Sequence, residues 1–182
     1  MADRFLICWP YTLIQECQFP NNWSSSRNFS NDAHDPGGAT MCGIIQREYD
    51  VYRRSKGLPT RAVRLISKDE GQEIYENSYW LPDCPKLPAG IDLCVFDESV
   101  NAGPHEAIKL LQAALGTPAD GAWGPQTDAA VKGIANVAGT IGNYTARREA
   151  FYRSLSGFRY FGGDWIRRSR EIGAEALKMA AS

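Results

Sequence analysis

The stretch Asp35-Pro36-Gly37-Gly38-Ala39-Thr40-Met41-Cys42-Gly43-Ile44 interrupts a chain whose other segments are mostly helical in pattern. Two adjacent glycines after a proline favour a tight turn that another backbone or a ligand can approach closely. Asp35 and Thr40 bracket this turn, and a carboxylate and a hydroxyl at this spacing can hold a water molecule between them. The alternative interpretation is an ordinary Asx-type turn.

A short helix is predicted over residues 11–17, entered through Pro10, and it precedes a loop over residues 18–38 that is rich in Asn, Ser, Asp, Pro and Gly. Few compact domains contain so long a loop without secondary structure, so its length favours a functional role. A small β-hairpin near residues 18–43 is compatible with the same sequence. The expected fold class is therefore mainly α, with at most this small β element.

Helical periodicity and helix-start signals mark most of the remaining chain. Ser67 and Glu70 form a capping box at the start of one helix, and Pro104 and Pro125 suit the first turns of two others. The apolar run over residues 91–100 indicates a buried helix, with a strand as the alternative. The predicted helices cover residues 44–56, 67–80, 91–100, 104–116, 125–131, 147–155 and 164–179, with an interruption around Gly162 and Gly163.

Composition excludes several classes of function. The chain has 182 residues, 43% of them hydrophobic, and a formal net charge of −1, which gives no overall attraction to nucleic acid. It is long enough for one compact domain or for two small lobes that share a core. No apolar run is long enough for a transmembrane helix, and residues 1–10 carry no standard secretory signal. Residues 147–182 hold eight Lys or Arg against four Asp or Glu, which indicates a solvated helix face or a surface that meets an anionic polymer or lipid.

The cysteines are odd in number, so at least one is unpaired within the chain. Their spacing fits no common zinc pattern. They are either buried small apolar residues or, in an oxidising compartment, include a disulfide such as Cys17 with Cys42. His34 and His105 are too isolated to be proposed as metal ligands, so no metal site is predicted. The five cysteines are Cys8, Cys17, Cys42, Cys84 and Cys94.

Glu16 is the only acidic residue between Asp3 and Asp32, and it ends the first predicted helix close to the apolar Leu13 and Ile14. Burial of a carboxyl group against apolar side chains disfavours its charged form. A protonated carboxyl is what a general acid needs in order to protonate a leaving oxygen. The alternative for a lone glutamate at a helix end is a solvent-exposed surface residue.

Several motifs occur together in a fixed order, and they extend over nearly the whole chain. With them the chain resembles the family 108 glycoside hydrolases, the lysozyme-like muramidases of phages and proteobacteria. The chain departs from that family after Glu16, where Cys17-Gln18-Phe19 stands in place of Gly-Gly-Tyr, and an insertion is expected at about residues 20–30. The matching motifs are Asp35 to Thr40, Gly43-Ile44, Tyr79-Trp80-Leu81-Pro82, Phe96-Asp97, Val100-Asn101-Ala102-Gly103-Pro104, Leu111 through Thr127, and Phe161 to Arg168.

The resemblance implies a lysozyme-like helical fold in which residues 1–88 form the catalytic part. Residues 89–182 would form a helical peptidoglycan-binding part packed on it, or the two would form one compact domain. The implied reaction is hydrolysis of the β-1,4 bond between N-acetylmuramic acid and N-acetylglucosamine. Glu16 would be the general acid, Asp35 the second carboxylate, and Thr40 would help to position the water. No cofactor is implied.

Aromatic side chains are candidates for a sugar-binding cleft, because their faces stack on pyranose rings. Trp23 and Phe29 lie in the polar loop and suit a cleft wall. Tyr79 and Trp80 either line the cleft or belong to the core, and the core is the preferred interpretation. Asn101 and Trp123 lie within the matching motifs and complete the predicted substrate-binding residues.

Peptidoglycan is thus the expected partner of a monomeric protein with no nucleic-acid partner and no integral membrane segment. We expect synthesis in the bacterial cytoplasm without a standard signal peptide, and action on the cell wall in the periplasm, as in phage lysis by an endolysin. Two alternatives are a lytic transglycosylase that leaves 1,6-anhydro ends and a catalytically inactive peptidoglycan-binding protein. Glu48 is the competing acid, although nothing in the family pattern supports it.

Overall fold

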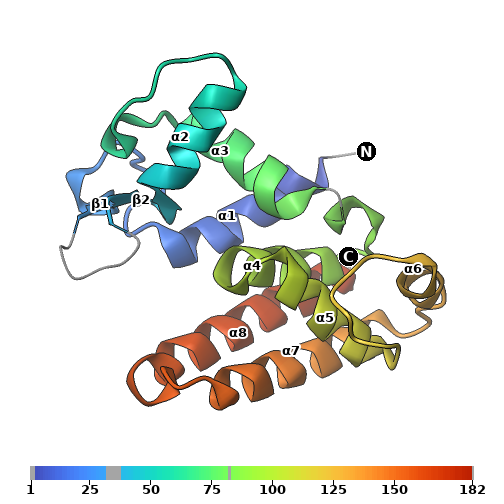
Figure 1. Cartoon of the computed structure of the whole chain (residues 1–182). Helices are drawn as coiled ribbons and strands as arrows, with labels where there is room; N and C mark the ends of the chain where they lie inside the picture. The colour runs from blue at the N-terminus through green and yellow to red at the C-terminus, as the bar shows by residue number, and fades with distance from the viewer. Residues whose placement is uncertain (1–2, 32–37, 82, 182) are drawn as a thin grey trace. The chain divides into compact units, whose positions relative to one another are not determined.

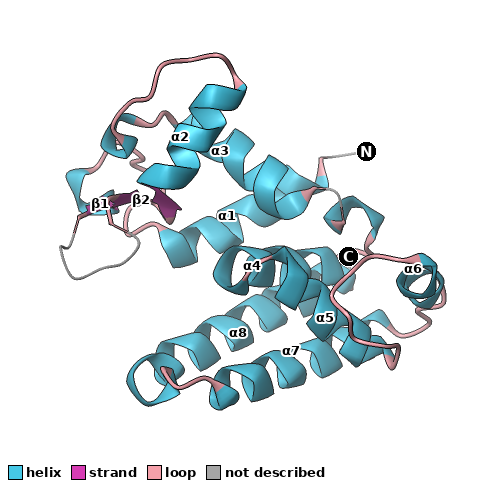
Figure 2. Cartoon of the chain, in the orientation of Figure 1, coloured by secondary structure: helices cyan, strands magenta, loops and turns pink. Residues whose placement is uncertain are grey.

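The computed structural model describes residues 3–31, 38–81 and 83–181, and it divides into two compact units. One unit comprises Met1–Cys8 and Tyr79–Ser182, and the other comprises Trp9–Ser78. Helices dominate both units (Figure 1), and the strands of the described residues form one small sheet (Figure 2). The predicted mainly α fold class is therefore confirmed.

Helix α1 (Arg4–Glu16) begins earlier than the sequence predicts, and Pro10 lies inside it. A proline in a helix interior removes one intrahelical hydrogen bond. Phe5, Cys8 and Trp9 on this helix are nevertheless at most 4% exposed, and the burial of their side chains offsets that cost. The division between the two units falls between Cys8 and Trp9, next to the proline.

The Trp9–Ser78 unit holds a three-stranded antiparallel sheet in the order β1-β2-β3. The sheet confirms the small β element near residues 18–43 and extends it, because Ile44 and Ile45 form a strand where a helix was predicted to begin. Thr40 lies opposite Ile45 in this sheet. The elements after α1 are η1 (Ser26–Asn28), β1 (Phe29–Ser30), β2 (Thr40–Met41), β3 (Ile44–Ile45), α2 (Gln46–Ser55), η2 (Val63–Leu65), α3 (Lys68–Tyr75) and a π-helical turn, η3 (Glu76–Trp80), that runs into the other unit.

Two buried side chains order the described part of the long loop, residues 18–31. Asn28 accepts a hydrogen bond from the backbone N–H of Phe19 (2.7 Å) and donates to three backbone carbonyls of the loop. The indole N–H of Trp23 donates to the carbonyl of Ile66 (2.9 Å). Its ring covers Gly71 so closely that a Cβ there would lie 2.4 Å from it. This part of the loop is therefore held by buried polar and aromatic groups.

In the other unit, helix α4 is central, since every residue from Ile91 to Ser99 is buried. It packs against α5, α7 and α8, which lie below and beside it in the view of Figure 1. The segment predicted over residues 91–100 is thus a helix, and the strand alternative is wrong. The elements are η4 (Cys84–Lys86), α4 (Ile91–Ala102), α5 (Pro104–Leu115), α6 (Pro125–Lys132), α7 (Val137–Ser154) and α8 (Phe158–Ala180).

Helix α8 is continuous through Gly162 and Gly163, so the predicted interruption is wrong. Gly162 is buried, and a Cβ at this position would lie 2.5 Å from the ring of Phe158. The glycine therefore allows an aromatic side chain of the first turn to pack back onto its own helix. Helix α7 begins ten residues before the predicted start, with the side chain of Asn136 accepting from the N–H of Gly139.

An ionic cluster lies at the centre of this unit and consists of Asp97, Glu98, Arg148 and Arg168, all at most 8% exposed. Arg148 and Arg168 contact the two carboxylate oxygens of Asp97 at 2.6 and 3.0 Å, and Arg148 also contacts Glu98 at 2.5 Å. Burial opposes ionisation of Asp97, but Arg168 and Arg148 outweigh it and hold its pKa below the usual value. The cluster joins α4 to α7 and α8.

The motif block over residues 111–127 shapes the turn between α5 and α6. The amide nitrogen of Gln112 donates to Asp120 (2.7 Å), to Thr127 (2.9 Å) and to a backbone carbonyl of the turn. Its amide oxygen accepts from the N–H of Gly121 (2.8 Å). The Leu-Gln, Asp-Gly and Gly-Pro-x-Thr elements of the block therefore hold one another in place through a single buried glutamine.

Candidate active site

Glu16 is the last residue of α1, and its side chain is half-buried. The next residue, Cys17, is bound to Cys42 by a disulfide, the pairing considered from the sequence. Cys42 belongs to the turn between β2 and β3, so the bond attaches the end of α1 to the hairpin. The other cysteines of the described residues, Cys8, Cys84 and Cys94, are free and buried.

The turn between β2 and β3, called the 42–43 turn below, consists of Cys42 and Gly43. Both residues have positive φ angles, 45° and 76°. Two central residues with positive φ are what a two-residue β-hairpin loop requires, because such turns match the twist of the strands. A glycine adopts this conformation easily, whereas a cysteine does so at a cost.

The carboxylate of Glu16 lies against this turn. A Cβ built on Gly43 would be 2.8 Å from Oε2 of Glu16 and 2.7 Å from the hydroxyl oxygen of Tyr75. Tyr75 reaches the turn from α3 and donates its hydroxyl proton to the carbonyl of Cys42 (2.8 Å). The end of α1, the hairpin and α3 therefore meet around Gly43, with a carboxylate and a phenol at the same point.

Thr40, the predicted water-positioning residue, lies on β2 of the same hairpin, two residues before the 42–43 turn. Its hydroxyl donates to the carbonyl of Gly38 (3.1 Å), and its side chain is half-buried. Asp35, the predicted second carboxylate, lies outside the described residues. The structure thus brings Glu16 to the hairpin that carries Thr40.

The two aromatic residues predicted to form a cleft wall lie in different surroundings. Trp23 is 7% exposed and is fixed by its hydrogen bond to Ile66. This placement supports a core role for Trp23, so its assignment to a cleft wall is a prediction that the geometry does not favour. Phe29 is half-buried on β1 and lines a cavity of about 300 Å³, whose other lining residues are Ser24, Ser25, Ser26, Met41, Arg64 and Leu65.

The two remaining predicted binding residues belong to the other unit. The side-chain amide of Asn101 donates to the hydroxyl of Tyr152 (2.8 Å), which itself donates to Glu98 of the ionic cluster. Trp123 is half-buried, and the ammonium group of Lys86 lies 4.6 Å from its ring centroid. Asn101 therefore has an internal partner in this structure, and the role of both residues in substrate binding remains a prediction.

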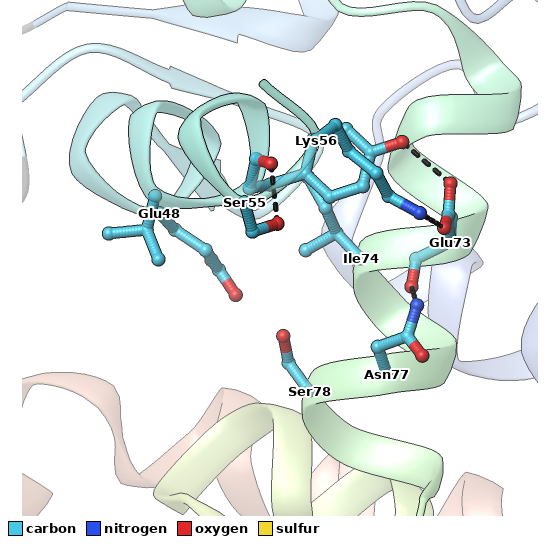
Figure 3. A pocket seen from close by; sticks show the side chains of 9 residues that line it. Glu48, Ser55, Lys56, Glu73, Ile74, Asn77 and Ser78 are labelled. Carbon is cyan, nitrogen blue, oxygen red and sulfur yellow. Dashed lines mark hydrogen bonds and ion pairs between the residues drawn. The ribbon is translucent and has the colours of Figure 1, made fainter. Parts of the chain in front are cut away.

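A pocket lined by carboxylates lies between α2 and α3 in the Trp9–Ser78 unit and has a volume of about 410 Å³. Figure 3 shows the side chains of Glu48 and Ser78 pointing toward its open space. The other carboxylate in its lining, Glu73, is held by Lys56 and by the hydroxyl of Tyr52. These two partners lower the pKa of Glu73, which favours its ionised form. Glu48 is thus the remaining candidate for a proton donor in this pocket.

Sequence reasoning missed Tyr75 and the 42–43 turn as parts of this site. Tyr75 lies in the helix predicted over residues 67–80 and is 1% exposed. Its hydroxyl reaches the turn across 33 residues of sequence. Gly43 was visible as part of the Gly43-Ile44 motif. Its position directly after Cys42 was the available signal for a hairpin turn.

The part of the chain that the structure describes contains no group of three or more His, Cys, Asp or Glu side chains arranged to hold a metal ion. Within the same residues, no helix combines the length and the apolar character that a membrane span needs.

Residues 26–103 match the family model described as glycosyl hydrolase 108. The match runs from the start of η1 to the end of α4, so it includes the sheet, the 42–43 turn, α3 and Tyr75. It begins after Glu16, within the insertion expected at about residues 20–30.

A comparison with solved structures finds a likeness over nearly the whole chain. Eleven chains of solved structure match, and one of them is SagA from Brucella abortus, with a TM-score of 0.80 and 28% sequence identity. The alignment covers 98% of this chain and 96% of that one. No curated protein matches. The likeness in structure confirms the helical, lysozyme-like fold class. The match over residues 26–103 and the likeness to SagA together identify the protein as a glycoside hydrolase. Its activity class is that of the peptidoglycan hydrolases.

Proposed function

We propose that the protein is a muramidase that hydrolyses the β-1,4 bond between N-acetylmuramic acid and N-acetylglucosamine, with Glu16 as the general acid. The observation that carries the proposal is the position of the Glu16 carboxylate. Its Oε2 atom lies against the 42–43 turn, on a half-buried side chain whose neighbour Cys17 is bound to that turn. A catalytic carboxyl needs such a rigid support, because small displacements of a reacting group cost large factors in rate.

In the proposed reaction, protonated Glu16 donates its proton to the glycosidic oxygen while the bond from that oxygen to the anomeric carbon breaks. The sugar then carries oxocarbenium-like charge, and a water molecule adds to the anomeric carbon. A second carboxylate accepts the proton of that water. Asp35 and Thr40 are the residues proposed to orient the water. The product is a free reducing end on N-acetylmuramic acid.

Glu48 is the other acid for which an observation exists, since it lines the pocket of about 410 Å³ between α2 and α3. Helix α2 carries it, whereas Glu16 ends a helix that the disulfide ties to the hairpin. We favour Glu16 because the residue next to it, Cys17, is bound covalently to Cys42 of the turn. Glu48 provides the matched control for the experiment.

The test compares the variants Glu16→Gln and Glu48→Gln with the unchanged protein on purified sacculi and on chloroform-treated Gram-negative cells. Glutamine keeps the shape of the side chain and removes the proton donor. We expect Glu16→Gln to lower the rate of glycan cleavage by about 10²- to 10⁴-fold, with an unchanged circular dichroism spectrum. Glu48→Gln should retain nearly the full rate. Full lysis by Glu16→Gln would contradict the assignment, and loss of cleavage in Glu48→Gln alone would transfer it to Glu48.

Mass spectrometry of the released muropeptides distinguishes the proposed reaction from its alternatives. Reducing ends support hydrolysis, whereas 1,6-anhydro ends would identify a lytic transglycosylase. Binding of the unchanged protein to sacculi without release of either product would identify a binding protein. The sacculus-binding assay with Glu16→Gln measures binding in the absence of cleavage. It thereby tests whether the chain binds peptidoglycan, the role proposed for residues 89–182. The periplasm is the proposed place of action, because the polymer lies there.

A further inference from the structure

The 42–43 turn holds the single non-glycine residue with positive φ among residues 3–31, 38–81 and 83–181, which is Cys42. A side chain in this backbone region costs about 1 kcal/mol or more, and it persists only where the surroundings impose it. Strained residues of this kind cluster at sites where a group must be held in a set position. The backbone conformation of Cys42 must therefore be imposed by its contacts with the surrounding residues.

Three contacts hold Cys42, and each comes from a different segment. Its sulfur is bound to Cys17 at the end of α1. Its N–H donates to the carbonyl of Asn28 (3.1 Å), the residue that orders the loop before the sheet. Its carbonyl accepts the hydroxyl proton of Tyr75 (2.8 Å). The first contact is covalent and the second joins two backbone groups. The third is the only one of the three that depends on a side-chain hydroxyl, that of Tyr75.

Gly43, the other residue of the turn, leaves room for two oxygen atoms. A Cβ at this position would lie 2.7 Å from the Tyr75 hydroxyl oxygen, 2.8 Å from Oε2 of Glu16 and 3.2 Å from Cβ of Glu16. Oxygen and carbon atoms that are not bonded do not approach so closely. The hydroxyl and the carboxylate thus border the same small space, which exists because residue 43 has no side chain.

We propose that Tyr75 is a positioning residue for Glu16. Its hydroxyl fixes the Cys42 carbonyl and thereby the turn against which the Glu16 carboxylate rests. Gly43 completes the arrangement by leaving the space that the carboxylate borders. The inference rests on the proposed function, in which Glu16 donates the proton. It adds that the rate depends on a tyrosine of α3 that need not touch the substrate.

The first experiment compares Tyr75→Phe with Tyr144→Phe. Tyr144 is a matched control because it is also 1% exposed and donates its hydroxyl to a backbone carbonyl, that of Ala107 (3.2 Å), in the other unit. Both variants lose a buried hydrogen bond from a tyrosine hydroxyl to a backbone carbonyl, so a purely structural role predicts similar effects. We expect kcat to fall by about tenfold to hundredfold in Tyr75→Phe and to stay nearly unchanged in Tyr144→Phe. Binding to sacculi should not change in either variant.

A second experiment approaches the same space from the turn. Gly43→Ala introduces both positive-φ strain and crowding of the carboxylate, whereas Gly57→Ala introduces the strain without the crowding. Gly57 has a φ of 68° and nothing within 4 Å of the position of its Cβ. We expect Gly43→Ala to lose kcat by at least as much as Tyr75→Phe, and Gly57→Ala to keep it.

A double-mutant cycle separates the inference from the function on which it rests. If Tyr75 acts through Glu16, adding Tyr75→Phe to Glu16→Gln causes no further loss of the residual rate. Equal kcat in Tyr75→Phe and Tyr144→Phe, or a full additional loss in the Glu16→Gln background, would overturn the positioning role and leave the Glu16 assignment intact. Full activity of Glu16→Gln itself would overturn the proposed function first.

Discussion

Asp97 and Glu16 are both acids held by several segments of chain, but in different ways. Asp97 is 0% exposed and receives two arginines inside the ionic cluster. Glu16 is half-buried and lies against a strained hairpin turn whose glycine is exposed. The charge of Asp97 is matched within the protein, whereas the Glu16 side chain is partly exposed to solvent.

The difference shows how position distinguishes an acid that stabilises the fold from an acid available for chemistry. A buried carboxylate is tolerated when cations and hydrogen bonds compensate for its lost hydration. Asp97 belongs to the Phe96-Asp97 motif of the family resemblance, yet its contacts are all internal ones. Asp97 therefore joins three helices. The comparison predicts that changes at Asp97 mainly lower the stability, whereas changes around Glu16 mainly lower the activity.

The largest effect is expected from Asp97→Asn, which leaves two buried guanidinium groups without their carboxylate. Breaking a buried ion pair in this way costs about 3–5 kcal/mol of unfolding free energy. The measurement is denaturant unfolding followed by circular dichroism. Any loss of activity should follow the loss of folded protein.

Glu149→Gln is the matched control for that variant, because Glu149 pairs with the exposed Arg153 and Arg170 on the same pair of helices. An ion pair at the surface contributes about 1 kcal/mol or less. If Asp97→Asn cost no more than Glu149→Gln, the ionic cluster would have no special part in stability.

The next effect concerns the disulfide that ties Glu16 to the turn. Replacing Cys17 and Cys42 together by serine removes a cross-link that closes 25 residues, which corresponds to about 3 kcal/mol in the chain-entropy model. Because the same bond attaches Glu16 to the hairpin, we expect kcat to fall as well. Unlike Asp97→Asn, this variant should lose rate even under conditions where it is fully folded.

Treatment of the unchanged protein with a dithiol reductant should reproduce both losses, as two protein thiols form and the dithiol is oxidised. The double serine variant should not respond to the reductant, because its other cysteines are already free. A rate that is the same before and after reduction would show that the turn holds Glu16 without the bond.

The smallest effect is expected from pH and concerns Glu70 at the start of α3. Burial opposes its ionisation, but the N–H of Ser67 and the side chains of Tyr49 and Arg53 outweigh burial and hold its pKa below the usual 4.5. Since the unfolded chain then takes up the proton first, this stabilisation is present above about pH 4.5 and is lost as the pH falls through the folded-state pKa. Thermal unfolding should show a smaller decrease between about pH 5 and about pH 3 for Glu70→Gln than for the unchanged protein. Parallel curves would exclude this contribution.

Local signals predicted the helices that begin or end with a strong capping residue. The capping box of Ser67 and Glu70 is present with both of its hydrogen bonds. Helix α5 begins at Pro104 and ends before Gly116, whose φ of 72° is the left-handed conformation expected of a terminating glycine. At these positions the information lies within a few residues of the helix end.

Errors occurred where distant packing outweighed local preference. Pro10 suggested the start of a helix, but burial of Phe5 extends α1 one turn and more before it. The helix predicted over residues 147–155 was begun too late, because Ile141 and Tyr144 are each 1% exposed and anchor the start of α7. Propensity is a weak preference that tertiary contacts often override.

The candidate site divides in the same way. Glu16 and Thr40 were available from the sequence through the family resemblance. The contact from Tyr75 to Cys42 was not, because it joins two segments that come together only through the packing of α3 on the hairpin. A tyrosine with an inward position in a helix has the same sequence signature whether it positions an acid or only fills the core.

Helix α1 carries a consequence for synthesis of the chain. Its residues up to Cys8 belong to the same unit as Tyr79–Ser182. Within that unit Phe5 contacts the rings of Trp80 and Phe96. During translation Phe5 leaves the ribosome long before those partners do, and chains are made at only about 5–20 residues per second. The Trp9–Ser78 segment is available to fold first, so the beginning of the helix waits exposed until its partners emerge. The start of α1 can therefore pack in its final position only after Trp80 and Phe96 have been synthesised.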